Sequence, residues 1–96
     1  MQNTQVFTQS GGISTGLALS ASTVVKASKG RVARISVTTA GAAGAIYDSA
    51  TVGGASASNL IAVVPATVGI YILDFPVQTG ITYIPGASQV ASISFY

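Results

Sequence analysis

Apolar residues in this chain come in short runs that proline, glycine or small polar residues interrupt. The run Leu60–Val64 ends at Pro65, and the run Ile70–Phe75 ends at Pro76. Proline cannot donate a backbone hydrogen bond to a neighbouring strand, so each run must stop there or lie at a sheet edge. No segment keeps its apolar residues at the helical spacing of 3.6. The chain must therefore fold from short strands.

Strand-length segments, rich in β-branched residues, continue from Leu17 to the end of the chain, with frequent turn residues between them. They are LALSAS, TVVKA, RVARISVTT, AIYDSATV, LIAVV, IYILDF, ITYI and VASISFY. The pattern predicts an all-β fold for residues 17–96, a single small jelly-roll-like β-sandwich of about eight short strands, with a small barrel as second choice. Residues 1–16 read as a flexible N-terminal arm, with Val6 and Phe7 as candidate anchors or, alternatively, as part of a frayed terminus.

Two of the strands are apolar on one face only, because alternate side chains of a strand point to opposite faces. In the first, Ala33, Ile35 and Val37 are predicted to face the core, and in the second Ala91, Ile93 and Phe95. Pro85-Gly86 fits the central positions of a type II turn, in which glycine accepts a positive φ.

Two other strands, 60–64 and 70–75, are apolar on both faces. Tyr71, Leu73 and Phe75 share one face of the second strand, and Ile70 and Ile72 share the other. One face meets the sandwich core, so the other needs a different cover, and a neighbouring copy is the simplest one. The predicted oligomer interface comprises Ile70, Ile72, Asp74, Leu60 and Ala62. Asp74 is placed at its rim, solvated or facing a cation of another chain.

Only 6% of the residues are charged, against about 25% in an ordinary globular protein. Such a surface resists aggregation poorly when bare, so we expect other subunits to cover much of it. The alternative is a sparsely charged monomer that Ser, Thr and Gln keep soluble. No membrane span is predicted, although the mean hydropathy is +0.62, because no apolar run approaches the roughly 18 residues required. The first residues show no signal-peptide pattern.

The chain has no His, Cys or Glu, and Asp48 and Asp74 are its only acidic side chains. The usual transition-metal ligands and the Ser–His–Asp arrangement are thus excluded. The two aspartates could form an acid–base pair, but their surroundings match no aspartic-protease motif. No phosphate-binding glycine motif is present either. We therefore expect no enzyme activity, no metal site and no cofactor.

All four cations, Lys26, Lys29, Arg31 and Arg34, lie within nine residues. Three interpretations remain open: a solvated turn, a patch that docks onto an acidic protein surface, or a nucleic-acid contact. Nucleic acid is the least favoured, because no aromatic residues are interleaved to stack on bases.

The blocks KASKGRVARISVTTAG, AIYDSA and NLIAVVPATVGIYILDFPVQTGITYIPGASQVASISFY resemble a group of small tailed-bacteriophage virion proteins. The resemblance covers about residues 24–96. It implies a β-rich decoration or cement protein on the capsid exterior, commonly a trimer bound to the major capsid protein. The basic segment 26–34 is then the candidate capsid-docking site.

Two other classes stay open. One is a receptor- or glycan-binding knob of a virion fibre, with Tyr47, Asp48, Asn59 and Tyr83 as candidate loop-tip residues. The other is a self-assembling tube or filament subunit, whose mass would grow with concentration.

Overall fold

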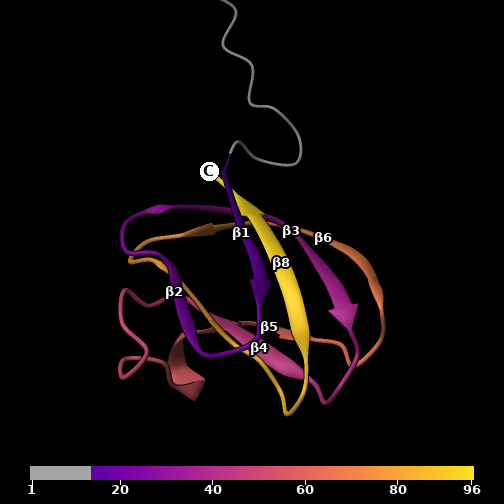
Figure 1. Cartoon of the computed structure of the whole chain (residues 1–96). Helices are drawn as coiled ribbons and strands as arrows, with labels where there is room; N and C mark the ends of the chain where they lie inside the picture. Colours follow the sequence, from indigo (N-terminus) through magenta and orange to yellow (C-terminus); the bar gives the residue numbers. More distant parts are fainter. Residues whose placement is uncertain (1–13) are drawn as a thin grey trace, which may run out of the picture.

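The structure is a computed structural model, and it describes residues 14–96. Eight strands and one 3-10 turn make up this part of the chain (Figure 1). Their bounds are β1 Ser14–Leu19, β2 Thr23–Lys26, β3 Gly30–Thr39, β4 Gly44–Tyr47, η1 Ala57–Asn59, β5 Leu60–Val64, β6 Gly69–Val77, β7 Ile81–Ile84 and β8 Val90–Phe95.

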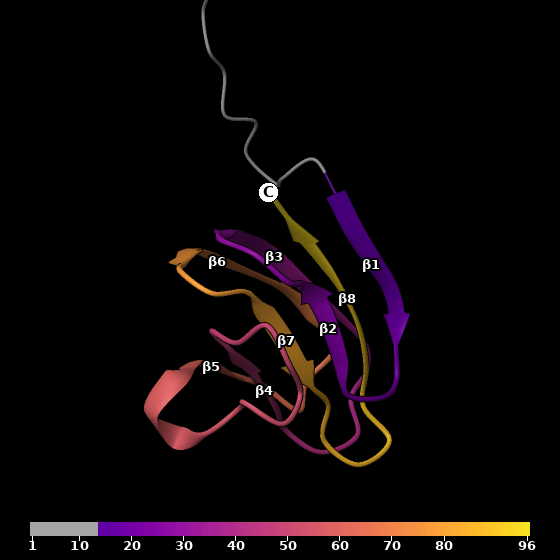
Figure 2. The ribbon, with the colours of Figure 1, turned by 90° about the vertical axis from the view of Figure 1, so that its left-hand side faces the viewer.

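The strands form two antiparallel four-stranded sheets, which pack face to face (Figure 2). The first sheet has the order β1-β8-β3-β6, and the second has the order β2-β7-β4-β5. Strands pair as β1 with β8, β2 with β7, β3 with β6 and β4 with β5. This is the order of a long hairpin rolled into two layers, which defines a jelly roll. The predicted jelly-roll-like sandwich is confirmed.

The core lies between the two sheets and is almost wholly aliphatic. Its buried members are Val32, Ile35, Val37, Ile46, Val64, Val77, Ile81, Tyr83, Ala91 and Ile93. The predicted inward positions of β8 are confirmed, since Ala91 and Ile93 are buried and Phe95 packs against the core. Strict alternation along a short strand was enough to identify them.

The prediction for β3 is confirmed, because Ala33, Ile35 and Val37 are all buried. Val32 opposes Phe95 and Arg34 opposes Ser94, so two steps along β3 match one step along β8. This bulge interrupts the alternation and adds Val32 to the core, so that two consecutive residues of β3 are buried. A bulge adds one residue to one strand and shifts the faces of the residues beyond it.

The first strand begins at Ser14, so residues 14–16 of the predicted arm pair with β8 instead. The rest of that arm, with Val6 and Phe7, lies outside the described residues. The turn prediction at Pro85-Gly86 is wrong: Ser88, with a φ of 63°, takes the left-handed conformation there, and Gly86 does not. Gly86 is required for a different reason, since a Cβ at this position would lie 2.3 Å from the carbonyl oxygen of Ala42.

Candidate interaction surface

Strand β6 forms one edge of the first sheet and exposes an unusual amount of aliphatic surface. Tyr71 and Leu73 pack against the core, whereas Ile70 and Ile72 are 70% and 72% exposed. Within residues 14–96, nothing covers the face that carries the two isoleucines. The sequence pattern correctly indicated an apolar second face, and the fold leaves that face open.

The exposed apolar side chains continue from β6 onto β5, at the edge of the second sheet. Figure 2 shows both strands at the same side of the sandwich, and a short turn joins them. Six of the eight exposed large hydrophobic side chains in residues 14–96 lie on this stretch, and we call them the edge patch. They are Leu60, Val63, Val68, Ile70, Ile72 and Phe75.

Of the residues predicted for the interface on β5, the structure leaves Leu60 exposed, whereas Ala62 is only half exposed. Val63 is the most exposed residue of this strand, and the sequence reasoning missed it. The register shifts between the pairs Ile46–Ala62 and Tyr47–Leu60, so β5 carries one extra residue there. Alternation counted from the sequence cannot locate such a shift.

Asp74 lies in a bulge of β6 and pairs with a cation of its own chain. Arg34 opposes Ile72 and Val32 opposes Phe75, so β6 uses three steps where β3 uses two. Asp74 has a φ of 47°, the left-handed conformation that non-glycine residues rarely adopt. The Arg31 guanidinium donates to both the Oδ1 atom and the backbone carbonyl of Asp74, each at 3.2 Å.

Phe75, which was predicted to share the inward face with Tyr71 and Leu73, is 48% exposed and does not join the core. The bulge at Asp74 separates it from the regular part of the strand. Phe75 opposes Val32 of the core, so it keeps the predicted face of the strand, but its side chain is not buried as predicted.

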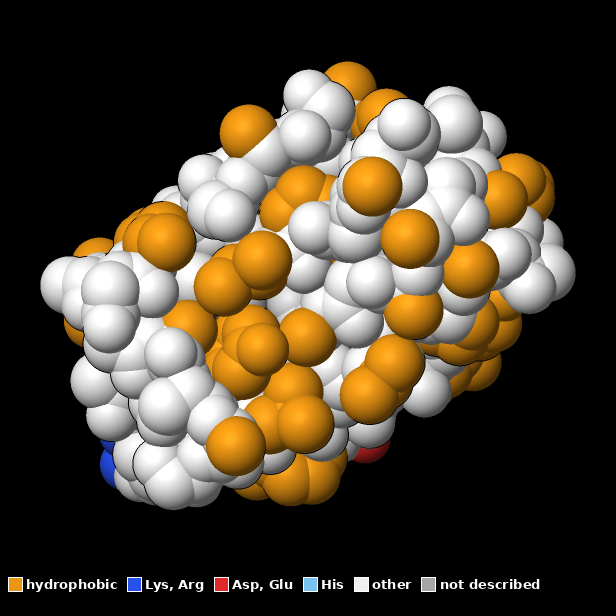
Figure 3. Space-filling view, turned by 90° about the horizontal axis from the view of Figure 1, so that it is seen from below, with side chains coloured by type: hydrophobic (Ala, Val, Ile, Leu, Met, Phe, Trp, Pro, Cys, Tyr) orange, Lys and Arg blue, Asp and Glu red, His pale blue; other side chains and the backbone are white. Residues whose placement is uncertain are grey.

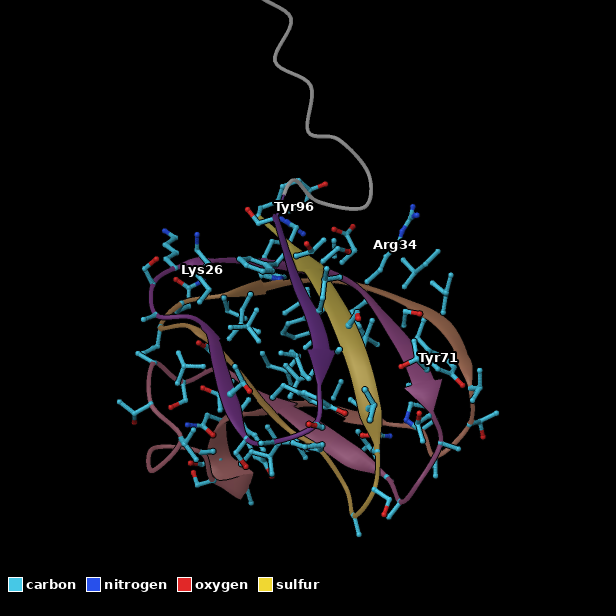
Figure 4. The ribbon with its side chains drawn as sticks, viewed as in Figure 1. Lys26, Arg34, Tyr71 and Tyr96 are labelled. Atoms are coloured by element: carbon cyan, nitrogen blue, oxygen red, sulfur yellow. The ribbon has the colours of Figure 1, made fainter. Side chains whose placement is uncertain are left out.

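The four cations do not form one compact patch. Lys26 ends β2, Lys29 lies in the exposed turn that follows, and Arg31 is held by Asp74. Figure 4 shows Lys26 and Arg34 on the same upper side of the sandwich but at opposite ends of it. On the face seen from below, on the side of the second sheet, Figure 3 shows mainly apolar and neutral side chains, with charged side chains only at the margins.

Arg34 stands on the outer face of the first sheet among small hydroxyl side chains. Two cross-strand rows meet there: Thr15, Ser94, Arg34 and Ile72 form one, and Ser92, Ser36 and Ile70 form the other. Between them lies a depression of about 280 Å³, which we call the Arg34 hollow. It is lined by Thr15, Arg34, Ser36, Ile70, Ser92, Ile93 and Ser94. Ile70 thus belongs both to this hollow and to the edge patch.

Asp48 has a role inside the fold rather than at a site. Its carboxylate accepts hydrogen bonds from the backbone N–H groups of Gln78, Thr79 and Gly80, at 2.8 to 3.2 Å. Burial by itself would raise the pKa of Asp48, but the three donors outweigh it and lower the pKa below its ordinary value of 3.8. The side chain fastens the turn between β6 and β7.

Of the other candidate loop-tip residues, Tyr83 and Asn59 are also engaged within the fold, whereas Tyr47 is the half-buried last residue of β4. Tyr83 is fully buried, and its hydroxyl donates to Oε1 of the buried Gln89, whose Nε2 donates to the Pro65 carbonyl at 3.0 Å. Burial raises the pKa of the Tyr83 hydroxyl to about 12. The Asn59 side chain bonds to the backbone of Gly54 and Ser56. The expectation that Tyr83 presents an exposed ring is wrong.

Comparison of the chain with protein-family models, with curated proteins and with solved structures finds no significant match. The 3-10 turn η1, the one helical segment of residues 14–96, has three residues and is too short to cross a membrane. In the same part of the chain, no group of three acidic, His or Cys residues is placed to hold a metal ion.

Proposed function

We propose that this protein is a capsid decoration, or cement, protein of a tailed bacteriophage, which binds the exterior of the assembled head as a homo-oligomer, most simply a trimer. The observation that carries the proposal is the edge patch. The resemblance over residues 24–96 supplies the class of virion protein. Together they favour a module whose task is to adhere to other subunits.

The edge patch suits a permanent contact between copies. Fully burying an isoleucine side chain is worth roughly 1.5–3 kcal/mol, and Ile70 and Ile72 have most of that gain still available. Large exposed apolar surfaces usually mark the sites at which a protein binds partners. A second copy placed against β5 and β6 would remove this surface from water.

A cement protein must bind both its own copies and the shell, and this protein has a separate surface for each contact. In this proposal the edge patch serves self-association, and the face with Arg34 at one end and Lys26 and Lys29 at the other docks onto the shell. Arg31 serves the fold, because it holds the bulge at Asp74. Strand β6 belongs to both surfaces, so docking and oligomerisation meet along it.

No bond needs to be made or broken for this function. A protein that binds an assembled shell but not its free subunits stabilises the shell by mass action. The sandwich offers a rigid body for that purpose, since strong antiparallel pairing joins each sheet and an aliphatic core joins the two layers. Binding across several shell subunits then adds buried area where the shell is strained by packed DNA.

The direct test is sedimentation of the purified protein with expanded, DNA-free heads of the virus that encodes it, stripped of decoration protein. We expect saturable binding to the heads and none to free major capsid protein subunits. Absence of binding to the heads over the micromolar range would overturn the proposal.

A further inference from the structure

The Arg34 hollow contains a cation without an anionic partner. Among residues 14–96 the only ion pair joins Arg31 to Asp74, and no hydrogen bond of the Arg34 side chain is formed. The backbone N–H of Arg34 donates to Ser94 Oγ at 3.2 Å, so this hydroxyl is directed to the main chain. The N–H groups of the guanidinium are therefore free to donate two parallel hydrogen bonds to a carboxylate, in bidentate geometry.

A second copy of the chain has no acidic side chain to offer to Arg34. Asp48 and Asp74 are the only acidic residues of the sequence. Asp48 is held by three backbone donors, and Asp74 is held by Arg31. Asp48 could reach Arg34 of another copy only by breaking contacts that its own fold uses, and the charge of the exposed Asp74 is already balanced by Arg31. A carboxylate of a different protein would pair with Arg34 without competing with either contact.

The walls of the hollow suit a single acidic side chain better than a large ligand or a nucleobase. The volume of about 280 Å³ is at the lower limit of small-molecule pockets, which span about 300–1,000 Å³. No aromatic side chain lines the hollow, so bases have nothing to stack on. Ile70 forms one wall of the hollow, at its border with the edge patch.

We propose that the Arg34 hollow binds an Asp or Glu side chain of a heterologous protein, with Arg34 as the charged contact and the Ser36 and Thr15 hydroxyls as polar neighbours. This inference rests on the proposed function, and it names the chemistry of the docking partner. It also separates Arg34 from Arg31, although the two lie three residues apart on the same strand.

The test uses the full chain, labelled with ¹⁵N, and a capped five-residue peptide with a central glutamate between serine and threonine. We expect a dissociation constant in the millimolar range. The amide chemical shifts of residues 34, 36, 92 and 94 should change on addition of the peptide. The same peptide with glutamine in place of glutamate should bind about tenfold more weakly, since it lacks the charge-assisted hydrogen bonds.

Two variants serve as a matched pair. Well-dispersed amide signals in the ¹H–¹⁵N NMR spectrum show whether each variant is folded. Arg34→Gln should bind the glutamate peptide only as weakly as the unchanged protein binds the glutamine peptide. Arg31→Gln should bind the glutamate peptide with the same affinity as the unchanged protein. Equal binding of both peptides, shifts centred on residues 26–29, or displacement of the peptide by a short single-stranded oligonucleotide would overturn the inference.

Failure of this inference differs from failure of the proposed function. Protein that binds heads but not the glutamate peptide refutes the role of the hollow and leaves the decoration function standing. Protein that binds the peptide through Arg34 but not the heads supports the hollow and refutes the function.

Discussion

At the scale of single residues, the backbone conformation assigns roles that residue type alone does not. Gly86 was predicted to supply a positive φ, yet it is needed because the carbonyl of Ala42 approaches too closely for any Cβ. The positive φ values fall on Asp74 and Ser88, among others. Aspartate tolerates the left-handed conformation better than most residues, because its short polar side chain can bond locally.

Asp48 makes stability depend on pH in the acid range. Its pKa is lowered in the folded state, so its contribution is complete above the unfolded value of 3.8 and is lost as the pH falls through the folded value. We expect Asp48→Asn to cost about 1 kcal/mol at pH 6, a modest figure because the carboxylate is only half-buried and water screens its hydrogen bonds. Urea unfolding at pH 6 and at pH 2.5 measures this, and the difference between the two proteins should shrink at the lower pH. A constant difference would contradict the assigned role.

Tyr83 should be visible in an alkaline titration followed at the absorbance of tyrosinate. Its pKa is raised to about 12, so the folded protein keeps this proton while the unfolded chain loses it near pH 10. Stability should accordingly fall between about pH 10 and pH 12. Tyr83→Phe should abolish this late ionisation step. Persistence of that step in the variant would assign it to another tyrosine.

At the scale of the element, β6 shows in which part of a strand the alternation of side chains predicts their faces and in which part it does not. From Ile70 to Leu73 the two faces are those that the sequence indicates. Beyond Leu73 the bulge interrupts the alternation, and Phe75 is 48% exposed although it opposes the buried Val32. Bulges and charges also protect an edge strand from unwanted pairing. The C-terminal half of β6 has both a bulge, at Asp74, and a charged pair, Arg31–Asp74. Its N-terminal half has neither a bulge nor a charge.

The bulge predicts a contrast between two substitutions of Asp74. Asn tolerates the left-handed conformation, so Asp74→Asn should cost only the exposed ion pair, about 0.2–1 kcal/mol. Ala does not, so Asp74→Ala should cost roughly 1 kcal/mol more. Chemical unfolding of the two variants at neutral pH measures the difference. Equal stabilities would mean that the backbone of Asp74 is not strained in solution.

At the scale of the whole molecule, the jelly-roll order places β5 and β6 at one side and β1 and β2 at the other. Exposed apolar residues of two strands and the turn between them are thus gathered along one edge of the sandwich. Arg34 and Ile72, predicted for two different surfaces, lie directly opposite each other on neighbouring strands. An assembly built on this molecule must arrange its self-contact and its docking contact around the same strand.

The edge patch predicts the effect of a charge on the oligomer. Ile72→Asp should keep the fold, since this side chain is 72% exposed, but should reduce the assembly to monomers, because an unpaired charge is costly to bury in an interface. Light scattering over a range of concentrations measures the mass. A closed trimer has one mass at all concentrations above its dissociation range, while a filament subunit grows with concentration.

Leu17→Asp provides the matched control for this experiment. Leu17 is 71% exposed but lies on β1, at the opposite edge of the first sheet. Its substitution should leave the mass unchanged. An unchanged mass for Ile72→Asp, or an equal loss of mass for both variants, would show that the contact does not depend on the edge patch.

The architecture could be predicted from the amino-acid sequence: strands separated by turns, a two-layer sandwich, and the inward residues of β8. These follow from local alternation and from the positions of proline and glycine, which act within a few residues. The second apolar face of β6 could be predicted for the same reason.

Only the tertiary structure decided which side chains meet across the sheets. Arg31 and Asp74 are 43 residues apart in the chain, and a one-residue shift of register at the bulges would separate them. The same register buries Tyr83, exposes Val63 and surrounds Arg34 with hydroxyl groups. Long-range pairing sets these contacts, because every bulge exchanges the faces of the residues beyond it and no local pattern marks where the bulge will fall.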